Sequence, residues 1–395
     1  MKILQVIPVF AESFGGTVSA VRSISKELAK THDVVVYTTT AVDSKHDFEP
    51  KEEIVDGYRV IYFKRTFKSL CYSGFFGQLN LSYDMLNAVR KNLKDFDVVH
   101  VHSWQQFPDV LVGYYAKKYN VPFVLQVHGS LPNIISKQRL KKLFDILIGY
   151  KLLDNASKVI ALHNAEAAQY RTLGVPKSKI AIVPNGMDIS QFSNLPSKGS
   201  FKKKYSIDQD ERIILFLGRL HVIKGLDILV KAFADVCKKV NTVRLAIVGP
   251  DDGYLAEIQA LVKNLELNDK VLFTGPLYGT AKVEAYVDSD VCVLPSRYET
   301  FPISLLEAYA CAKPVICSRL PGLRELVINE TTGILFELGD SKQLSSSILS
   351  LLTEANAEKI GQNGRLFIES NFTIDIVCKK LEKLYSSLSF HIIMR

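Results

Sequence analysis

Short apolar runs rich in β-branched residues alternate with helical stretches along the whole chain, and this alternation strongly limits the possible folds. Parallel strands joined by helices are buried on both faces, so the pattern predicts α/β architecture with doubly wound parallel sheets. The predicted strands of the first half are residues 3–7, 34–38, 59–63, 98–102, 123–127, 158–162 and 180–183. Those of the second half are residues 213–217, 244–248, 271–274, 291–294, 315–317 and 334–336.

The chain of 395 residues is long enough for two domains at roughly 100–200 residues each. Pro184-Asn185-Gly186 has turn chemistry, and the polar stretch 193–204 follows it, so the boundary is expected there. We predict one doubly wound domain over residues 1–185, a second over 186–370, and a final helix over 371–395 that packs back toward the first domain. Two such domains facing each other leave a cleft between the carboxyl edges of their sheets, where open α/β sheets bind ligands.

The net charge of +8 comes from the first half, where residues 1–185 hold 24 Lys and Arg against 16 Asp and Glu. This excess favours an anionic partner: a phosphate-bearing substrate, an acidic membrane surface or nucleic acid. Nucleic acid is disfavoured because the basic residues form no recognised binding module.

The chain has neither an apolar run long enough for a transmembrane helix nor a signal-peptide layout, which predicts an intracellular, cytoplasmic protein. The six cysteines are scattered, mostly inside apolar runs, and are expected to be reduced core residues rather than a disulfide or zinc framework.

Gly15-Gly16-Thr17 follows the first strand and precedes a helix predicted over residues 18–30. Paired glycines let the backbone approach a ligand, and a helix start offers N–H groups to a phosphate. A plain strand-to-helix turn is the alternative, since the motif is neither a P-loop nor a complete G-x-G-x-x-G.

Two cations follow the strand at residues 213–217, within Gly218-Arg219-Leu220 and Lys224-Gly225. Arg219 and Lys224 can both project from the carboxyl edge of the sheet and neutralise a diphosphate. The alternative is a pair of solvated surface cations.

The segment 294–308 combines two carboxylates with a helix start. Pro302 suits the first position of a helix, which puts Glu299 before the helix and Glu307 in its second turn. Carboxylates accept hydrogen bonds from the paired hydroxyls of a sugar or ribose. Acidic residues near a helix start also occur simply because they stabilise its dipole.

His128-Gly129 ends the strand at residues 123–127, so the imidazole is expected to face the cleft, in either a structural or a catalytic role. His100 and His102 lack a third metal ligand nearby and are expected to be packed or hydrogen-bonded. Asp288-Ser289-Asp290 has the form of a metal-binding D-x-D motif, yet it directly precedes an apolar strand. We expect a helix-to-strand turn there and no metal.

Two basic segments of the first half carry apolar or aromatic residues. Residues 134–150 have the spacing of an amphipathic helix with a basic polar side, and residues 62–76 mix cations with aromatic rings. Together they could rest on an anionic membrane. A domain-packing helix with a solvated basic side is the alternative.

Taken in order, these motifs resemble those of the family-4 retaining glycosyltransferases of the GT-B fold, over almost the whole chain. They are Gly15-Gly16-Thr17, His128-Gly129, Pro184-Asn185-Gly186-Met187-Asp188, Gly218-Arg219-Leu220 with Lys224-Gly225, Val248-Gly249-Pro250, and Glu299 followed eight residues later by Glu307. The resemblance implies two Rossmann-like domains, with the acceptor on the first and a nucleotide-diphosphate sugar on the second.

The resemblance also implies roles for single residues. Arg219 and Lys224 would hold the diphosphate and stabilise it as it leaves, and Glu307 would take the ribose hydroxyls. Glu299 would bind hydroxyls of the transferred sugar, and His128 a sugar hydroxyl at the reaction centre.

Four further residues would border the donor. Gly16 would let its loop close over the diphosphate, Gly275 would border the base, and backbone groups near Phe301 and Ile303 would cap the phosphates. Pro302 departs from the family pattern, because many members have glycine there and proline has no N–H to donate.

The implied activity is transfer with retention of anomeric configuration and without metal or other cofactor, from a UDP- or GDP-linked sugar. The basic first domain favours a glycan or lipid-linked acceptor in surface polysaccharide synthesis, which would hold the protein at the inner face of the membrane. A sugar-nucleotide epimerase or hydrolase of the same architecture, or a non-catalytic nucleotide-sugar binding protein, are the alternatives.

Overall fold

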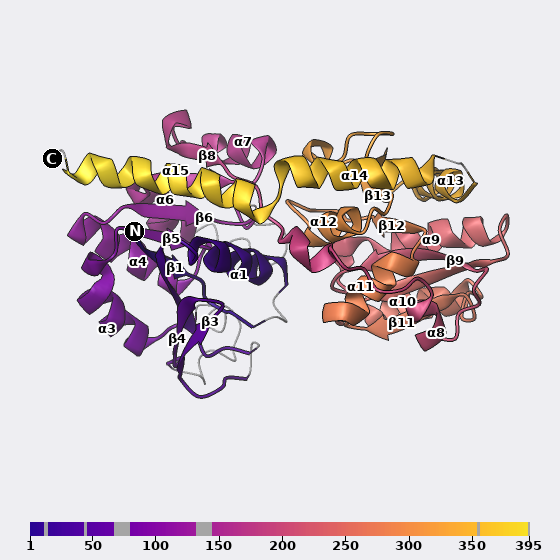
Figure 1. The fold of residues 1–395 in the computed structure, drawn as a ribbon, viewed down its shortest axis with the longest axis horizontal. Coiled ribbons are helices and arrows are strands. Elements are labelled where there is room, and N and C mark those ends of the chain that lie inside the picture. The colour runs from indigo at the N-terminus through magenta and orange to yellow at the C-terminus, as the bar shows by residue number, and fades with distance from the viewer. Residues whose placement is uncertain (12–14, 43–45, 67–79, 132–143, 354–355, 394–395) are drawn as a thin grey trace. The chain divides into compact units, whose positions relative to one another are not determined.

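The structure is a computed structural model that describes residues 1–11, 15–42, 46–66, 80–131, 144–353 and 356–393. The chain forms two compact units (Figure 1). The N-terminal unit comprises Met1–Met187 together with Ile374–Arg395, and the C-terminal unit comprises Asp188–Thr373. The chain therefore passes from one unit to the other twice.

The N-terminal unit is built on an eight-stranded sheet of order β3-β4-β2-β1-β5-β6-β7-β8. All neighbouring strands are parallel except β3 and β4, which pair antiparallel at one edge. The strands are β1 (Lys2–Val6), β2 (Asp33–Thr39), β3 (Glu52–Val55), β4 (Tyr58–Phe63), β5 (Val98–Val101), β6 (Phe123–Gln126), β7 (Lys158–Ala161) and β8 (Ile180–Ile182).

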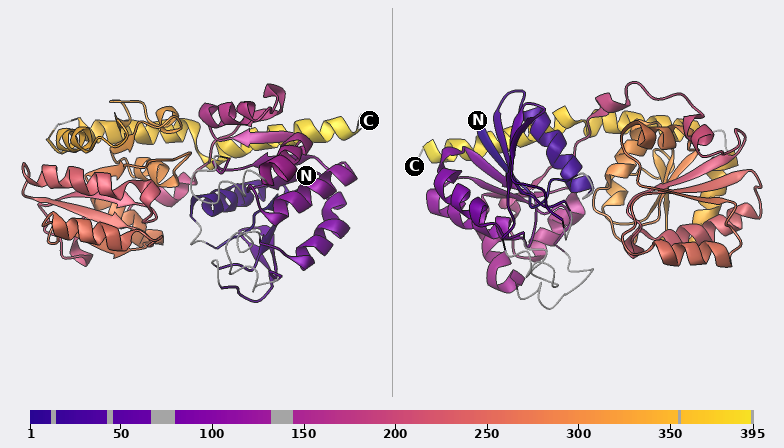
Figure 2. Two further views of the ribbon diagram at one scale, coloured as in Figure 1. Left: turned by 180° about the vertical axis from the view of Figure 1, so that it is seen from behind. Right: turned by 90° about the horizontal axis from the view of Figure 1, so that it is seen from below.

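Helices cover both faces of this sheet (Figure 2), as expected for parallel strands that are buried on either side. The helices are α1 (Gly16–Leu28), α3 (Tyr83–Asn92), η3 (Leu93–Asp95), α4 (Phe107–Tyr119), η4 (Asp145–Gly149), α6 (Tyr150–Asn155), α7 (Asn164–Thr172), η5 (Lys177–Lys179) and α15 (Ile374–Ile393). One core joins the sheet to α3, α4 and α6, and a second joins it to α1 and α15.

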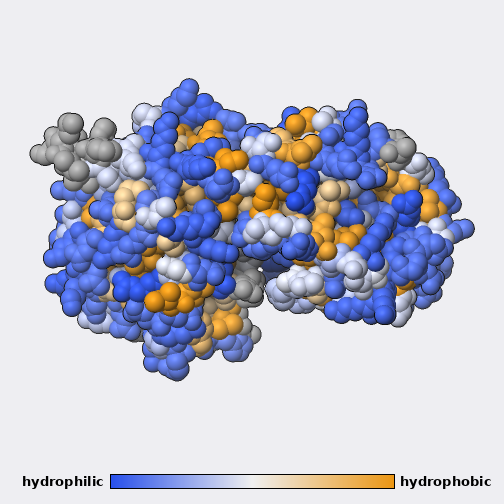
Figure 3. All heavy atoms as spheres, in the orientation of Figure 1, coloured by the Kyte–Doolittle hydropathy of each residue, from blue (hydrophilic) through white to orange (hydrophobic). Residues whose placement is uncertain are grey.

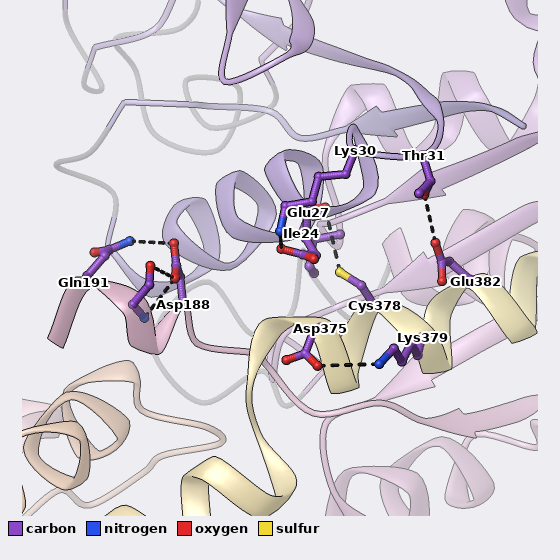
Figure 4. A network of polar contacts seen from close by, with 11 residues as sticks. Ile24, Glu27, Lys30, Thr31, Asp188, Gln191, Asp375, Cys378, Lys379 and Glu382 are labelled. Atoms are coloured by element: carbon purple, nitrogen blue, oxygen red, sulfur yellow. Dashed lines mark hydrogen bonds and ion pairs between the residues drawn. The ribbon is translucent and has the colours of Figure 1, made fainter. Parts of the chain in front are cut away.

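The last helix, α15, packs against α1 although more than 340 residues separate them in the sequence (Figure 4). Thr31 donates a hydrogen bond to Glu382 over 3.2 Å, and the Cys378 thiol faces the Ile24 carbonyl at 3.9 Å. Leu381 and Tyr385 of α15 are fully buried in the same core as β1 and β5. The end of the chain thus completes the unit that its beginning starts.

The C-terminal unit has a six-stranded, wholly parallel sheet of order β11-β10-β9-β12-β13-β14. Its strands are β9 (Arg212–Leu217), β10 (Val243–Val248), β11 (Val271–Gly275), β12 (Val291–Leu294), β13 (Val315–Ser318) and β14 (Gly333–Phe336). Strand order runs outward from β9 to β11, then returns to β12 on the other side of β9. This order has a switch point between β9 and β12, and ligands of doubly wound sheets bind at such points.

The helices of the C-terminal unit are η6 (Ile189–Phe192), α8 (Ser200–Lys204), η7 (Val222–Lys224), α9 (Leu226–Cys237), α10 (Leu255–Asn264), α11 (Gly279–Asp288), α12 (Ile303–Ala310), η8 (Leu323–Glu325), α13 (Ser341–Thr353) and α14 (Ala357–Asn371). Helix α9 packs against α10 and α13, and α12 packs against α14. The apolar side of α9 is buried along its whole length against the sheet.

The thirteen predicted strands all occur in the structure, with bounds that differ by a residue or two. Three details differ from expectation. Strand β3 was not predicted, the first helix begins at Gly16 rather than at residue 18, and α12 begins at Ile303, one residue after Pro302. Pro302 has an extended ψ of 121°, so it precedes the helix instead of forming its first residue.

Two sequence expectations fall on segments that lie partly outside the described residues: most of the amphipathic stretch 134–150 and most of the basic aromatic stretch 62–76. Five cysteines lie in the described part, all free and four of them buried. Within that part, no helix combines the length and the hydropathy needed to cross a membrane. The face of the molecule drawn in Figure 3 is largely polar, with apolar side chains in small groups.

Candidate functional site

The loops that follow β9 and β12 meet at the switch point of the C-terminal sheet, and glycine makes this close approach possible. Gly225 has a φ of 67°, and a Cβ there would lie 2.1 Å from the Pro295 carbonyl oxygen. Gly249, which follows β10, has a φ of 150°, and its Cβ would lie 1.8 Å from the Gly218 carbonyl oxygen. A side chain at position 225 would push the loops after β9 and β12 apart, and one at position 249 would push apart the loops after β10 and β9.

Lys224 and Glu299 form an ion pair at this point, reinforced by a 3.1 Å hydrogen bond from the Ser296 hydroxyl to Glu299. The two charged side chains are 19% and 11% exposed, so both are largely removed from solvent. An ammonium group has three N–H donors, so Lys224 can hold Glu299 and still donate to an incoming anion.

Arg297 fixes the loop that carries Lys224. Its backbone N–H donates to the Ile223 carbonyl over 2.7 Å, and its guanidinium makes two 2.8 Å bonds to Asp227 on α9. The imidazole of His221 accepts a hydrogen bond from the Ile223 N–H at 3.1 Å, which starts the short helix η7. Lys224 is therefore placed by a rigid backbone rather than by a free loop.

Arg219 lies in the same loop and has a different environment. Its guanidinium contacts Asp252 at 2.5 Å, and the two side chains are 52% and 41% exposed. This pair can open at little cost, because exposed ion pairs contribute only about 0–1 kcal/mol.

Glu307 lies in α12 and is buried, with each carboxylate oxygen already held. Lys282 of α11 donates to one oxygen and the Tyr286 hydroxyl donates to the other at 2.9 Å. Burial and the nearby carboxylate raise the pKa of Tyr286 well above its usual value, so this phenol remains a donor. Glu307 is thus fixed in orientation while keeping lone pairs for further O–H donors.

The remaining predicted residues of this unit lie at element ends. Gly275 ends β11 with a φ of 72°, a conformation that favours glycine. Phe301 is buried and packs edge-on to Phe372 with 5.6 Å between ring centroids. Ile303 begins α12, where the first N–H groups of the helix point toward its start.

In the N-terminal unit, His128 follows β6 with a positive φ of 49°. Burial lowers the pKa of His128 to about 3, so the ring is neutral. The buried carboxylate of Glu166 holds the turn, since it accepts 2.7 Å and 2.6 Å hydrogen bonds from the N–H groups of Gly129 and Leu162. Gly16 begins α1 after Gly15, whose φ is 79°.

Two sequence models match this chain almost end to end: the one described as Glycosyltransferase Family 4 over residues 14–191, and the one described as Glycosyl transferases group 1 over residues 197–367. The chain belongs to the family-4 glycosyltransferases and has the GT-B fold.

Among curated relatives, this glycosyltransferase is 27% identical to the D-inositol 3-phosphate glycosyltransferase of Kineococcus radiotolerans, over 81% of this chain and 76% of the relative. It is 28% identical to the N-acetyl-alpha-D-glucosaminyl L-malate synthase of Bacillus anthracis, over 75% of this chain and 76% of the relative.

Solved structures with a similar fold include Anabaena HepE in complex with UDP and glucose, with a TM-score of 0.80 at 20% identity over 98% of this chain and 100% of that chain. The sucrose-phosphate synthase of Thermosynechococcus elongatus has a TM-score of 0.76 at 24% identity, over 98% of this chain and 99% of that chain.

Some residues of this glycosyltransferase that shape the site were not predicted from its sequence. Asp252 was given no role, and Lys282, Tyr286, Arg297 and Glu166 were not singled out. Lys282 and Tyr286 are four residues apart on one helix, a spacing that places both on the same face, but only the fold shows that Glu307 lies opposite.

The D-x-D segment of this glycosyltransferase is confirmed as a helix-to-strand turn between α11 and β12. Asp288 accepts hydrogen bonds from the N–H groups of Gly199 and Lys202 at 2.5 and 3.0 Å, and Asp290 pairs with Arg212 at 2.8 Å. Both carboxylates therefore hold backbone or a cation of their own unit. Across the described ranges, no group of three His, Cys, Asp or Glu is arranged to hold a metal ion.

Proposed function

We propose that this glycosyltransferase moves a sugar from a nucleotide-diphosphate sugar, UDP- or GDP-linked, to an acceptor hydroxyl, with retention of anomeric configuration and without a metal ion. The observation that carries the proposal is the largely buried Lys224 at the β9–β12 switch point, with Arg219 in the same loop. Cations placed in advance stabilise the negative charge that develops on a departing diphosphate.

The other charged groups of the unit fit the same donor. Glu299 would bind hydroxyls of the transferred sugar beside Lys224, and Glu307 would accept hydrogen bonds from the ribose hydroxyls. Gly275 would border the base, and the N–H groups at the start of α12, near Phe301 and Ile303, would bind the phosphates. In the other unit, Gly16 and His128 would contact the diphosphate and a sugar hydroxyl.

Lys224→Ala tests this proposal. We expect kcat to fall roughly 10²- to 10³-fold, the cost of removing one pre-placed charge-stabilising donor. The matched control is Lys263→Ala, which removes an exposed lysine at the end of α10. Circular dichroism and the thermal midpoint show whether each variant is folded. Wild-type turnover by folded Lys224→Ala would refute the role.

Measuring product formation with and without an acceptor distinguishes this proposal from the alternative functions. An epimerase or hydrolase would convert the nucleotide sugar in the absence of any acceptor, whereas a transferase requires one. A non-catalytic binding protein would show nucleotide binding by calorimetry with no turnover at all.

We propose that the acceptor is a glycan or lipid-linked intermediate of surface polysaccharide synthesis, and that the enzyme binds it at the surface of an anionic membrane. The support is the basic N-terminal half together with apolar side chains on η4 and α6: Ile146, Leu147 and Tyr150 are 56%, 58% and 44% exposed. Exposed apolar residues in a part of the chain with excess positive charge suit a membrane surface. Binding to vesicles with anionic lipid, and not to neutral vesicles, is the expected result.

A further inference from the structure

Strands β1, β5 and β6 of the N-terminal unit carry a buried polar stripe on the face covered by α1 and α15. Elsewhere this face is apolar, with Ile3, Val98 and Val124 earlier on the same strands. Toward the carboxyl ends the alternating positions become polar: Gln5, His100, His102 and Gln126 are buried, and the half-buried His128 ends the stripe. Polar groups in such surroundings must find partners, because an unpaired buried donor or acceptor costs about 1–3 kcal/mol.

The partners form a chain that ends at His128. The Nε2 of His102 lies 2.5 Å from the Oε1 of Gln5, and its Nδ1 lies 3.1 Å from the Nε2 of His128. Beside this chain, the hydroxyl of Tyr385 on α15 lies 2.7 Å from the Nδ1 of His100, and the rings of His100 and His102 are 3.9 Å apart.

All three imidazoles are neutral. Burial lowers the pKa of His100 and of His102 well below the usual value, and it lowers the pKa of His128 to about 3. A neutral imidazole has one N–H donor and one lone-pair acceptor. The position of one proton in this chain of hydrogen bonds therefore fixes the positions of the others.

Gln5 sets the direction of donation along this chain of hydrogen bonds. Its carbonyl oxygen can only accept, so His102 carries its proton on Nε2 and offers a lone pair at Nδ1. His128 must then donate from Nε2, which leaves its Nδ1 unprotonated. This Nδ1 is enclosed by protein and has no hydrogen-bond partner among the residues that the structure describes.

We propose that Gln5 and His102 are positioning residues that hold His128 in the tautomer with Nδ1 unprotonated, so that this unpaired nitrogen accepts a hydrogen bond from a substrate hydroxyl that reaches it on binding. The proposal rests on the function proposed above for the role of that hydroxyl, but the tautomer itself is a property of the free protein. An acceptor nitrogen selects O–H groups and rejects carbonyl, carboxylate and phosphate oxygens, which have no proton to give.

Nuclear magnetic resonance of the full chain with ¹⁵N-labelled histidine reads the tautomer directly, since two-bond ¹H–¹⁵N correlations distinguish a protonated from an unprotonated ring nitrogen. His163 and His221 serve as internal references. Each accepts a hydrogen bond from a backbone N–H at Nδ1, from Glu166 and Ile223 respectively, and therefore carries its proton on Nε2. We expect His128 to show the same pattern as these two.

Two substitutions of Gln5 test its control over the chain. In Gln5→Glu the buried carboxyl would either keep a proton and donate it to His102 or hold His102 as an imidazolium, so we expect His128 to become protonated on Nδ1 and kcat/KM to fall. In Gln5→Leu the acceptor is lost, and we expect a mixture of tautomers with kcat/KM about tenfold lower, the cost of one hydrogen bond. Thr38→Val, which removes a buried hydroxyl from the neighbouring strand β2, should change neither.

The substrate hydroxyl is identified with donors that lack one sugar hydroxyl at a time. The donor that loses the bond to His128 should react about tenfold more slowly with the wild type and show no such penalty with His128→Ala. A His128 protonated on Nδ1 in the wild type, or a tautomer unchanged by both Gln5 substitutions, would overturn the inference. Absence of transfer from any nucleotide sugar, with the tautomer as expected, would instead overturn the proposed function.

Discussion

At the scale of single residues, the charged side chains of the candidate donor site all have partners of opposite charge before any ligand arrives. The pairs are Lys224 with Glu299, Arg219 with Asp252, and Glu307 with Lys282. A diphosphate must therefore share or displace existing partners. Sharing suits Lys224, which is held by a largely buried carboxylate, whereas displacement suits Arg219, whose partner is exposed.

Asp252→Asn should tighten nucleotide binding. The Asp252 carboxylate competes with a phosphate for the Arg219 guanidinium, and its charge also repels the ligand. An exposed pair is worth up to about 1 kcal/mol, so the Kd for UDP or GDP should fall by no more than about fivefold, and less at high salt. Isothermal calorimetry at two salt concentrations measures the effect.

Asp235→Asn is the charge-matched control, because Asp235 pairs with Lys238 at the far end of α9. It should leave the Kd unchanged. Equal tightening by both variants would mean that net charge, rather than competition at Arg219, controls nucleotide affinity.

At the scale of helices and strands, the sequence predicted most strands of both sheets, because buried parallel strands are largely apolar. Strand β3 was not predicted, because it begins with the charged residues Glu52 and Glu53. It lies at the edge of the sheet, where runs of β-branched residues are not required. The ion pairs of the site were not predicted for another reason. Lys224 and Glu299 are 75 residues apart in the sequence, and only the order of strands in the sheet brings them together.

The polar stripe on β5 and β6 should make the N-terminal unit sensitive to mild acid. Below about pH 6.5 His100, His102 and His128 take up protons when unfolded but not when folded, since burial lowers their pKa values, so stability falls as pH falls. Asp109 opposes this, because burial raises its pKa to about 7 and the folded state binds the extra proton. Burial also raises the pKa of Glu166, which acts in the same direction as Asp109.

The net effect is an uptake of one to two protons on unfolding, or about 1.4–2.8 kcal/mol lost per pH unit between pH 6 and 5. Urea unfolding followed by fluorescence of Trp104, which is buried in this unit, measures the slope. His100→Gln should make the slope shallower by one proton, and Asp109→Asn should make it steeper. Parallel slopes in all three proteins would contradict this assignment.

At the scale of the whole molecule, the two units are separate cores that the chain enters in the order first, second, first. The sequence predicted a change of domain near Gly186 from turn chemistry and a last helix that packs back toward the first domain. The structure adds which residues of that helix are buried, with Leu381 and Tyr385 in the core of the first unit.

This division gives the site a test that needs no substitution. The chain has one tryptophan, Trp104, so its fluorescence follows unfolding of the N-terminal unit alone, whereas circular dichroism follows both units. The cations proposed to bind the diphosphate lie in the other unit. A ligand at 100 times its Kd adds about 2.7 kcal/mol to the unit that binds it, or about 5 to 10 °C. UDP or GDP should therefore raise the midpoint of a transition seen by circular dichroism and leave the Trp104 transition in place. A nucleotide that moves only the Trp104 transition would show that the N-terminal unit, and not Lys224 and Arg219, provides its binding energy.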